Sequence, residues 1–147
     1  MIFFRTSRVG LPLKALLVSL PFVLAGAGCR SESSRQPLPF GVMDAPRSGE
    51  ALRGTVELRG WALSESGIKQ AIVYVDRNYA TTATLGIGRP DVAKAYPAFS
   101  HGADAGWTAS LDTGKFPAGT HELVVQGTAY NGATRDLGDI NVSFAKP

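Results

Sequence analysis

Several short stretches of the sequence alternate apolar and polar side chains, and turn-forming residues separate these stretches. Ile140, Val142 and Phe144 alternate with polar neighbours near the end of the chain, and Val56 and Leu58 do so nearer its middle. Successive side chains of a strand point to opposite faces, so this period of two predicts strands that each bury one face. Helical periodicity is weak beyond residue 40, and the pattern therefore favours an all-β fold.

Short strands of this kind, packed into about 105 residues, fit an antiparallel β-sandwich. Trp61 falls out of phase with Leu58, and a β-bulge at Gly60 is predicted to return the indole to the core face. In the segment 121–127, Leu123 and Val125 are predicted to point inward. About seven strands are predicted, at residues 40–43, 55–63, 68–75, 78–84, 107–111, 121–127 and 135–144.

The first 28 residues have the order of a secretory signal peptide. Basic residues come first, an apolar run at 15–24 follows, and small residues lead to Cys29. The uncharged run 15–29 is shorter than the roughly 20 residues that a membrane-spanning helix needs. A signal peptide is therefore favoured over a short transmembrane anchor or a buried helix. The basic residues are Arg5, Arg8 and Lys14.

The segment 26–29 (GAGC) resembles the lipobox of bacterial lipoproteins. The resemblance implies that Cys29 receives a thioether-linked diacylglycerol and becomes the first residue of the mature protein. Gly26 stands where that family prefers Leu, and 25–27 (AGA) offers a rival site for ordinary signal peptidase, which would give a soluble product starting at Gly28. Lipidation is favoured because the rival leaves a free cysteine without a role. By resemblance to Gram-negative sorting, Arg30 favours the outer membrane over the inner one.

Three parts of the chain are predicted: a signal peptide at 1–28, the lipidated Cys29 with a flexible tether at 29–39, and a folded domain at 40–147. The tether is rich in Ser and Pro and poor in apolar side chains. Three of the 15 basic residues and none of the 12 acidic ones lie in the signal peptide, so the mature part carries equal numbers of each sign. A net charge of zero argues against nucleic acid as a partner.

Five pieces of the segment 54–144 resemble a bacterial immunoglobulin-like (Ig-like) domain. The resemblance implies an Ig-like β-sandwich that spaces, binds or presents, and that does not catalyse. Many relatives carry an Asp after the Gly-Thr-His segment where this sequence has Ala129, so a calcium role of that Asp does not carry over. The pieces are 59–63 (RGWAL), 72–76 (IVYVD), 89–92 (RPDV) with 96–97 (YP), 106–107 (GW) with 111–113 (LDT), and 117–125 (PAGTHELVV).

The segment 85–106 is unusually long for a connection within a compact domain. Its residues 90–96 predict one or two helical turns, with Pro90 at the first position and Asp91 at the positive end of the helix dipole. Val92 and Tyr96 share a face that can dock on the edge of the sandwich. The helix is predicted either to cap an open sheet edge or to carry a binding surface. In the second case Arg89, free to meet an anionic group, and Tyr96 border the contact with a partner. The candidate binding surface comprises Arg89, Asp91, Tyr96 and Tyr74.

Motifs for catalysis or metal binding are weak. His121 follows a tight turn and is predicted to be a corner residue that bonds the backbone. His101 has Ser100 and Asp104 nearby, but a catalytic triad is made in space, so closeness in sequence says little. The Asp residues form no calcium-loop pattern, and neither His has a zinc-site spacing. The sequence therefore predicts no enzyme, no metal and no cofactor.

Aromatic residues permit a sharper hypothesis, an exposed platform for sugar rings. Trp61 and Trp107 are predicted to be core residues, and Tyr74 is the best exposed candidate. The favoured function is a non-enzymatic, lipid-anchored module for binding or assembly at the cell envelope. The alternative is a lipoprotein that binds peptidoglycan or another glycan, and a small hydrolase comes third. The aromatic residues considered are Trp61, Tyr74, Tyr79, Tyr96, Phe99 and Trp107.

Overall fold

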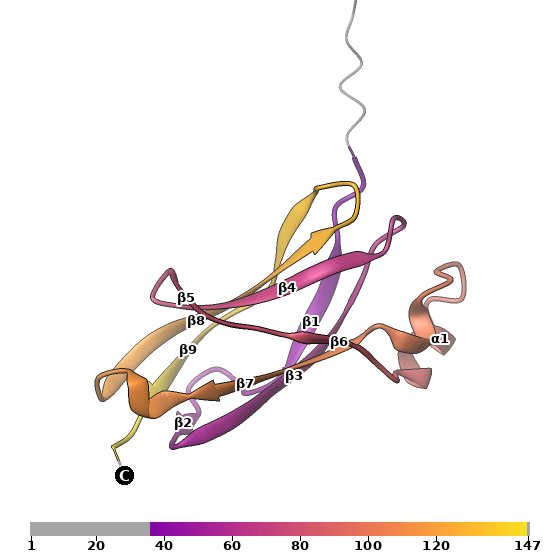
Figure 1. Ribbon diagram of the computed structural model, residues 1–147. Helices are drawn as coiled ribbons and strands as arrows, with labels where there is room; N and C mark the ends of the chain where they lie inside the picture. Colours follow the sequence, from indigo (N-terminus) through magenta and orange to yellow (C-terminus); the bar gives the residue numbers. More distant parts are fainter. Residues whose placement is uncertain (1–35, 147) are drawn as a thin grey trace, which may run out of the picture. The chain divides into compact units, whose positions relative to one another are not determined.

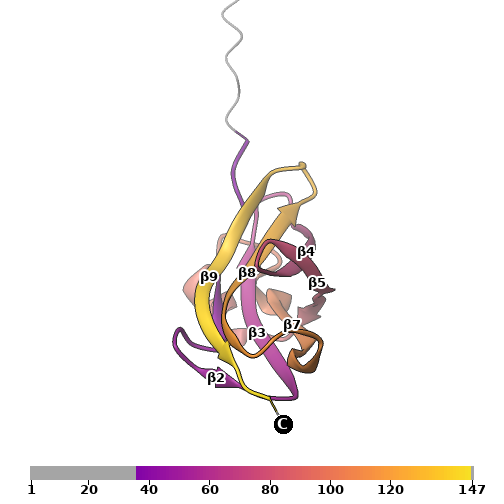
Figure 2. The ribbon, with the colours of Figure 1, turned by 90° about the vertical axis from the view of Figure 1, so that its left-hand side faces the viewer.

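Two β-sheets face each other across one hydrophobic core in the computed structural model, which describes residues 36–146 (Figures 1 and 2). One sheet has four strands in the order β1-β3-β7-β6, and the other has five in the order β2-β9-β8-β4-β5. All pairings are antiparallel except that of β2 with β9. The strands are β1 (Phe40–Ala45), β2 (Ala51–Leu52), β3 (Thr55–Leu63), β4 (Ile68–Val75), β5 (Asn78–Thr82), β6 (Thr84–Ile87), β7 (Gly106–Asp112), β8 (Gly119–Ala129) and β9 (Thr134–Phe144).

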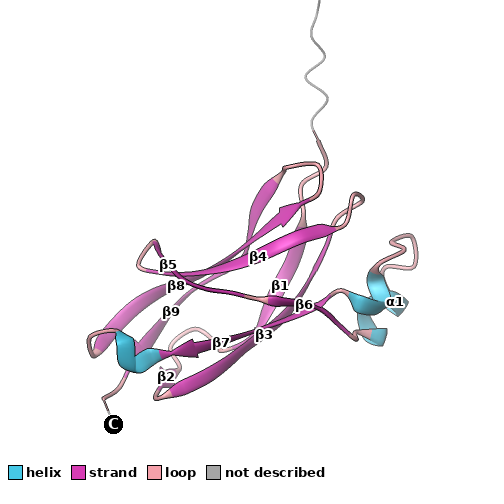
Figure 3. Cartoon of the chain, in the orientation of Figure 1, coloured by secondary structure: helices cyan, strands magenta, loops and turns pink. Residues whose placement is uncertain are grey.

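Between residues 36 and 146, helical structure is confined to three short segments (Figure 3). They are α1 (Pro90–Ala95), η1 (Gly102–Asp104) and η2 (Thr113–Lys115). Among the described residues, no helix is both long enough and apolar enough to cross a membrane. The all-β sandwich predicted from the alternating pattern is thus confirmed. The predicted signal peptide and Cys29 lie outside the described residues.

One predicted strand divides into two that belong to different sheets. The prediction joined residues 78–84, but β5 ends at Thr82 and pairs with β4, whereas β6 begins at Thr84 and pairs with β7. Between them, buried Ala83 donates its N–H to the carbonyl of Ala71 at 2.8 Å. The chain therefore changes sheets at a single residue, which periodicity along the sequence does not reveal.

The core lies between the inner faces of the two sheets. Leu123 and Val125 of β8 are fully buried, which confirms the predicted phase of that strand. Trp107 of β7 is also buried, as predicted, and its Nε1 has no hydrogen-bond partner among the described residues. Side chains from both sheets fill the core, so neither sheet leaves its inner face open.

The predicted bulge at Gly60 is wrong. β3 pairs with β7 residue by residue through Gly60, and Leu58, Gly60 and Ala62 all face the core. A Cβ on Gly60 would lie 2.5 Å from Cζ2 of Trp107, so the glycine makes room for the indole of the neighbouring strand. Trp61 consequently stays on the outer face of the sheet. The register shift occurs instead in β1, between Met43 and Ala45.

The segment that contains α1 covers the outer face of β1 and β3 at one end. Val92 of α1 is buried, and Tyr96, at the end of the helix, packs beside it as their spacing predicted. Both belong to a second apolar cluster that also includes Trp61 on β3 and Phe40 on β1. The helix therefore docks on the outer face of the sheet at its β1 edge, where β1 begins and β3 ends.

Candidate functional site

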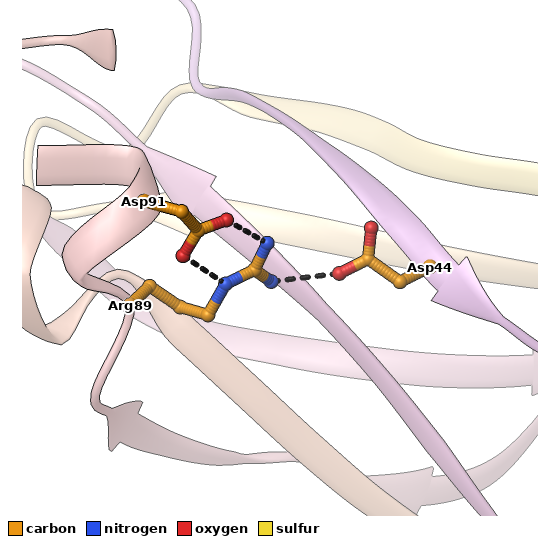
Figure 4. Close-up of polar contacts among 3 residues, drawn as sticks. All are labelled: Asp44, Arg89 and Asp91. Atoms are coloured by element: carbon orange, nitrogen blue, oxygen red, sulfur yellow. Dashed lines mark hydrogen bonds and ion pairs between the residues drawn. The ribbon is translucent and has the colours of Figure 1, made fainter. Parts of the chain in front are cut away.

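Arg89 precedes α1 and lies between two carboxylates (Figure 4). Its Nε and Nη2 donate to the two oxygens of Asp91 at 2.9 and 2.7 Å, and its Nη1 donates to Asp44 on β1 at 2.7 Å. Fork-to-fork pairing of this kind is the strongest geometry for an arginine and a carboxylate. The expectation that Arg89 is free to meet an anionic group is wrong, because both sides of its guanidinium are occupied.

The pKa values of Arg89 and Asp91 agree with the geometry of their hydrogen bonds. The hydrogen bonds from Arg89 lower the pKa of Asp91 to about 2, and the same bonds raise the pKa of Arg89 above its ordinary value. Two carboxylates and one guanidinium leave a net negative charge at neutral pH. The ion pair to Asp44 connects the α1 segment to the edge strand β1.

Tyr96 belongs to a cluster of four aromatic rings on the outer face of the four-stranded sheet. Its ring centroid lies 5.4 Å from that of Phe40, 5.3 Å from that of Trp61 and 6.3 Å from that of Phe99. Edge-on and tilted contacts at these distances stabilise aromatic pairs. Because the ring is half-buried among these partners, the contacts of Tyr96 hold the α1 segment on the sheet.

We expect the double substitution Arg89→Ala and Tyr96→Ala to lower the melting temperature by about 5–10 °C, the shift for about 1–2 kcal/mol of lost ring burial. The ion pair adds little because it is partly exposed. Thermal unfolding followed by circular dichroism measures the shift, with Lys94→Ala on the exposed face of α1 as the control. An unchanged melting temperature combined with lost capture of a partner would instead support the predicted binding surface.

Tyr74 lies away from Arg89 and Tyr96, on the outer face of the five-stranded sheet. It lines a shallow hollow with Arg77 and Gln126 and three acidic side chains. The ring is half-buried, whereas the well-exposed aromatic side chains of residues 36–146 are Tyr79 and Tyr130. Tyr79 on β5 is the direct cross-strand partner of Tyr74 on β4, whereas Tyr130 lies beyond the end of β8, so the three tyrosines do not form one row. The predicted binding residues Arg89, Asp91, Tyr96 and Tyr74 thus fall into two separate groups.

His121, at the corner where β8 begins, holds three parts of the fold together. Its Nε2 lies 2.8 Å from the carbonyl oxygen of Pro117, which confirms the predicted bond to the backbone. Its Nδ1 lies 2.6 Å from the carboxylate of Asp76, in the β4–β5 turn, and its ring stacks on Phe144 with centroids 4.4 Å apart. The other oxygen of Asp76 accepts from the N–H of Glu122 at 3.0 Å. Both ring nitrogens are therefore occupied by structural contacts.

A cleft of about 380 Å³ lies beside the β8–β9 turn, at the end of the sandwich where residues 36–39 enter the domain and Pro37 contacts Asn131. We call it the tether-end cleft. It lies among the β3–β4 turn, β6, the loop before β7 and the β8–β9 turn. Ile68 and Leu85 contribute apolar walls. Its polar and aromatic lining includes Ser64, Lys69, His101, Asp104 and Tyr130.

Hydrogen bonds between turns hold the rim of this cleft. The N–H of Tyr130 donates to the carbonyl of Gly67 at 3.1 Å, and the N–H of Asn131 donates to Oγ of Ser66 at 3.3 Å. The side-chain amide of Asn131 donates to the carbonyl of Pro37 at 3.2 Å. The β8–β9 turn is therefore connected both to the β3–β4 turn and to the segment that enters the domain.

Sequence reasoning missed this cleft, although it considered one of its residues. His101 and Asp104 both line it, but no side-chain hydrogen bond joins Ser100, His101 and Asp104 within the described residues. The Asn-Gly turn at 131–132 was a usable signal, because it places Tyr130 at the tip of a hairpin. Between residues 36 and 146, no group of three or more His, Cys, Asp or Glu side chains is arranged to hold a metal ion.

The two facing sheets define an all-β sandwich of the Ig-like class. Solved structures similar to it include the fibronectin(III)-like modules of CbhA from Clostridium thermocellum (TM-score 0.53, 14% identity) and an endo-beta-1,4-mannanase from Thermotoga petrophila (TM-score 0.52, 20% identity). The matches cover 75% and 79% of this chain, which spans only 48% and 21% of those two proteins. Similarity at these identities establishes the fold. No protein-family model and no curated protein matches the sequence.

Proposed function

We propose that the protein is a non-enzymatic, lipid-anchored Ig-like module that binds a partner at the cell envelope. The observation that carries this proposal is the position of the tether-end cleft. Pro37, eight residues after Cys29, accepts a hydrogen bond from Asn131 in the turn beside the cleft. A chain anchored through Cys29 therefore enters the domain at the same end as the tether-end cleft.

The length of the tether limits where a partner is met. The chain from Cys29 to Gln36 reaches about 25 Å when fully extended. Anchored in this way, the cleft stays close to the membrane surface, and its partner is a component of that surface or of the layer next to it. By the resemblance to Gram-negative sorting, that membrane is the outer membrane of the cell.

The arrangement of titratable side chains supports binding over catalysis. A general base must reach the proton that it removes, but the ring of His121 is buried and both its nitrogens contact Asp76 and Pro117. Arg89 is likewise held by two carboxylates. We therefore place the small hydrolase last among the candidate functions.

Glycan binding, the alternative function, is favoured by one specific feature. The exposed ring of Tyr130 lies at the tether-end cleft, next to His101 and to the charged side chains Lys69 and Asp104. An aromatic body with a few convergent polar groups is the usual composition of a small-ligand site.

Cys29→Ser tests the anchor. We expect the unsubstituted protein to enter the detergent phase of a Triton X-114 separation and to incorporate an alkyne-labelled fatty acid, because stable attachment needs more than one acyl chain. The variant should lose the label and either enter the aqueous phase or remain unprocessed. Arg30→Ala, next to the cysteine, is the matched control and should keep the label. Unsubstituted protein found in the aqueous phase would overturn the proposed anchoring.

A further inference from the structure

We propose that the tether-end cleft binds one sugar residue of an uncharged glycan, with the ring of Tyr130 stacking on the sugar. This inference rests on the proposed function only in placing the glycan near the membrane. The binding site itself is argued from the contacts of the described residues. The cleft volume of about 380 Å³ lies within the range of small-ligand sites, about 300–1,000 Å³.

Two aromatic rings flank one glycine at the cleft. A Cβ on Gly67 would lie 3.4 Å from Cδ2 of Tyr130 and 3.7 Å from Cδ2 of His101. Gly67 has φ +79°, a conformation that favours glycine, so the turn can keep the space between the rings free of a side chain. With 69% of its surface exposed, Tyr130 has little of its ring covered by the protein itself. The apolar C–H face of a sugar ring matches such a surface.

The charges of the lining select for a neutral ligand rich in hydroxyl groups. Lys69 supplies donors and Asp104 supplies acceptors, and their formal charges cancel. A hydroxyl group both donates and accepts, so one sugar can satisfy both side chains. A phosphate or carboxylate ligand would meet Asp104 without an excess of positive charge to compensate. The cleft is therefore better matched to an uncharged sugar than to an anionic lipid headgroup.

The site is formed before a ligand arrives. The hydrogen bonds from Tyr130 to Gly67 and from Asn131 to Ser66 fix the β8–β9 turn, which carries Tyr130, against the β3–β4 turn. Ser64, buried at the start of the β3–β4 turn, has its Oγ 3.2 Å from that of Ser66. A rim held in this way loses little conformational entropy on binding, which favours affinity.

The experiment uses the lipidated protein in detergent micelles and measures binding by isothermal titration calorimetry. The probes are three uncharged oligosaccharides, chitotetraose, cellotetraose and mannotetraose, with tetragalacturonate as the anionic comparison. Tyr130→Ala removes the ring and Tyr130→Phe keeps it. Tyr79→Ala is the matched control, because Tyr79 is 64% exposed and lies on β5, outside the cleft lining.

We expect at least one uncharged probe to bind more tightly than tetragalacturonate. Tyr130→Ala should weaken that binding about tenfold, the effect of losing a stacked ring, whereas Tyr130→Phe and Tyr79→Ala should leave it unchanged. Circular dichroism confirms that the variants are folded. The proposal is overturned if no uncharged probe binds, if Tyr130→Ala binds as well as the unsubstituted protein, or if tetragalacturonate binds best.

Two further measurements separate this proposal from the proposed function. The Cys29→Ser protein should still bind the oligosaccharide, because the cleft does not include the cysteine. If the anchoring test fails but oligosaccharide binding is intact, only the proposed anchoring is overturned. Vesicles of phosphatidylethanolamine and phosphatidylglycerol test a lipid headgroup as the occupant. If the Cys29→Ser protein binds these vesicles and Tyr130→Ala abolishes that binding, the cleft is a lipid site and the sugar proposal is wrong.

Discussion

Val125→Asp is expected to unfold the domain. Val125 lies at the centre of β8 with none of its surface exposed, opposite Val73 on one neighbouring strand and Gly138 on the other. A carboxyl group at that position has no partner, and burying it costs several kcal/mol whether it stays charged or becomes protonated. A domain of this size is stable by only about 5–15 kcal/mol in total. The substitution therefore removes most or all of the free energy of unfolding.

Val42→Asp provides the control for that result. Val42 is on the edge strand β1 and is 43% exposed, so the same chemical change there leaves the new carboxylate in contact with water. Chemical denaturation followed by circular dichroism compares the two variants. We expect an unfolding transition close to that of the unsubstituted protein for Val42→Asp and no cooperative transition for Val125→Asp. A folded Val125→Asp variant would contradict the inward phase of β8.

The fold could be predicted from the sequence where one strand carries its own signal. The bounds of β3 and β4 and the inward side of β8 follow from local alternation, because a half-buried strand must repeat every two residues. The prediction of a bulge at Gly60 failed because its signal lies on neighbouring strands and not in the local pattern. A side chain at Gly60 is excluded by the backbone carbonyl of Val42 on β1 and the indole of Trp107 on β7, and the local pattern locates neither neighbour.

The candidate site was harder to predict because its parts come from distant segments. The sequence correctly placed Asp91 in the first turn of α1, but the partner that occupies Arg89 from the other side is Asp44, 45 residues earlier. The tether-end cleft likewise gathers Gly67, His101 and Tyr130 from three connections. Only the pairing of strands brings these residues together.

The contact between Asp76 and His121 should make stability depend on pH in a defined direction. Hydrogen bonds from His121 and from the N–H of Glu122 lower the pKa of Asp76 below its ordinary value of 3.8. Burial alone would lower the pKa of His121, but the bonds to Asp76 and Pro117 outweigh it and raise that pKa above 6.5.

The sign of each contribution follows from these directions. Because the pKa of His121 is higher in the folded state, its stabilisation is complete below pH 6.5 and is lost as the pH rises through the folded value. The pKa of Asp76 is lower in the folded state, so its stabilisation is present above pH 3.8 and is lost as the pH falls. The pair therefore contributes most between these two pH values.

Asp76→Asn should change the sign of the pH dependence that His121 contributes: the unsubstituted protein loses stability as the pH rises above 6.5, whereas the variant gains stability as the pH rises towards 6.5 and then levels off. Without the carboxylate, burial becomes the main influence on His121 and moves its pKa below 6.5, so folding then favours the neutral ring and stability rises with pH. Near pH 5 we expect the variant to lose about 1–2 kcal/mol, with the lower end favoured because half of the Asp76 carboxylate is exposed. Denaturation midpoints from pH 5 to 8 measure both effects, and Asp139→Asn, an exposed carboxylate on β9, is the control. Parallel pH profiles for Asp76→Asn and the unsubstituted protein would show that this contact does not set the protonation of His121.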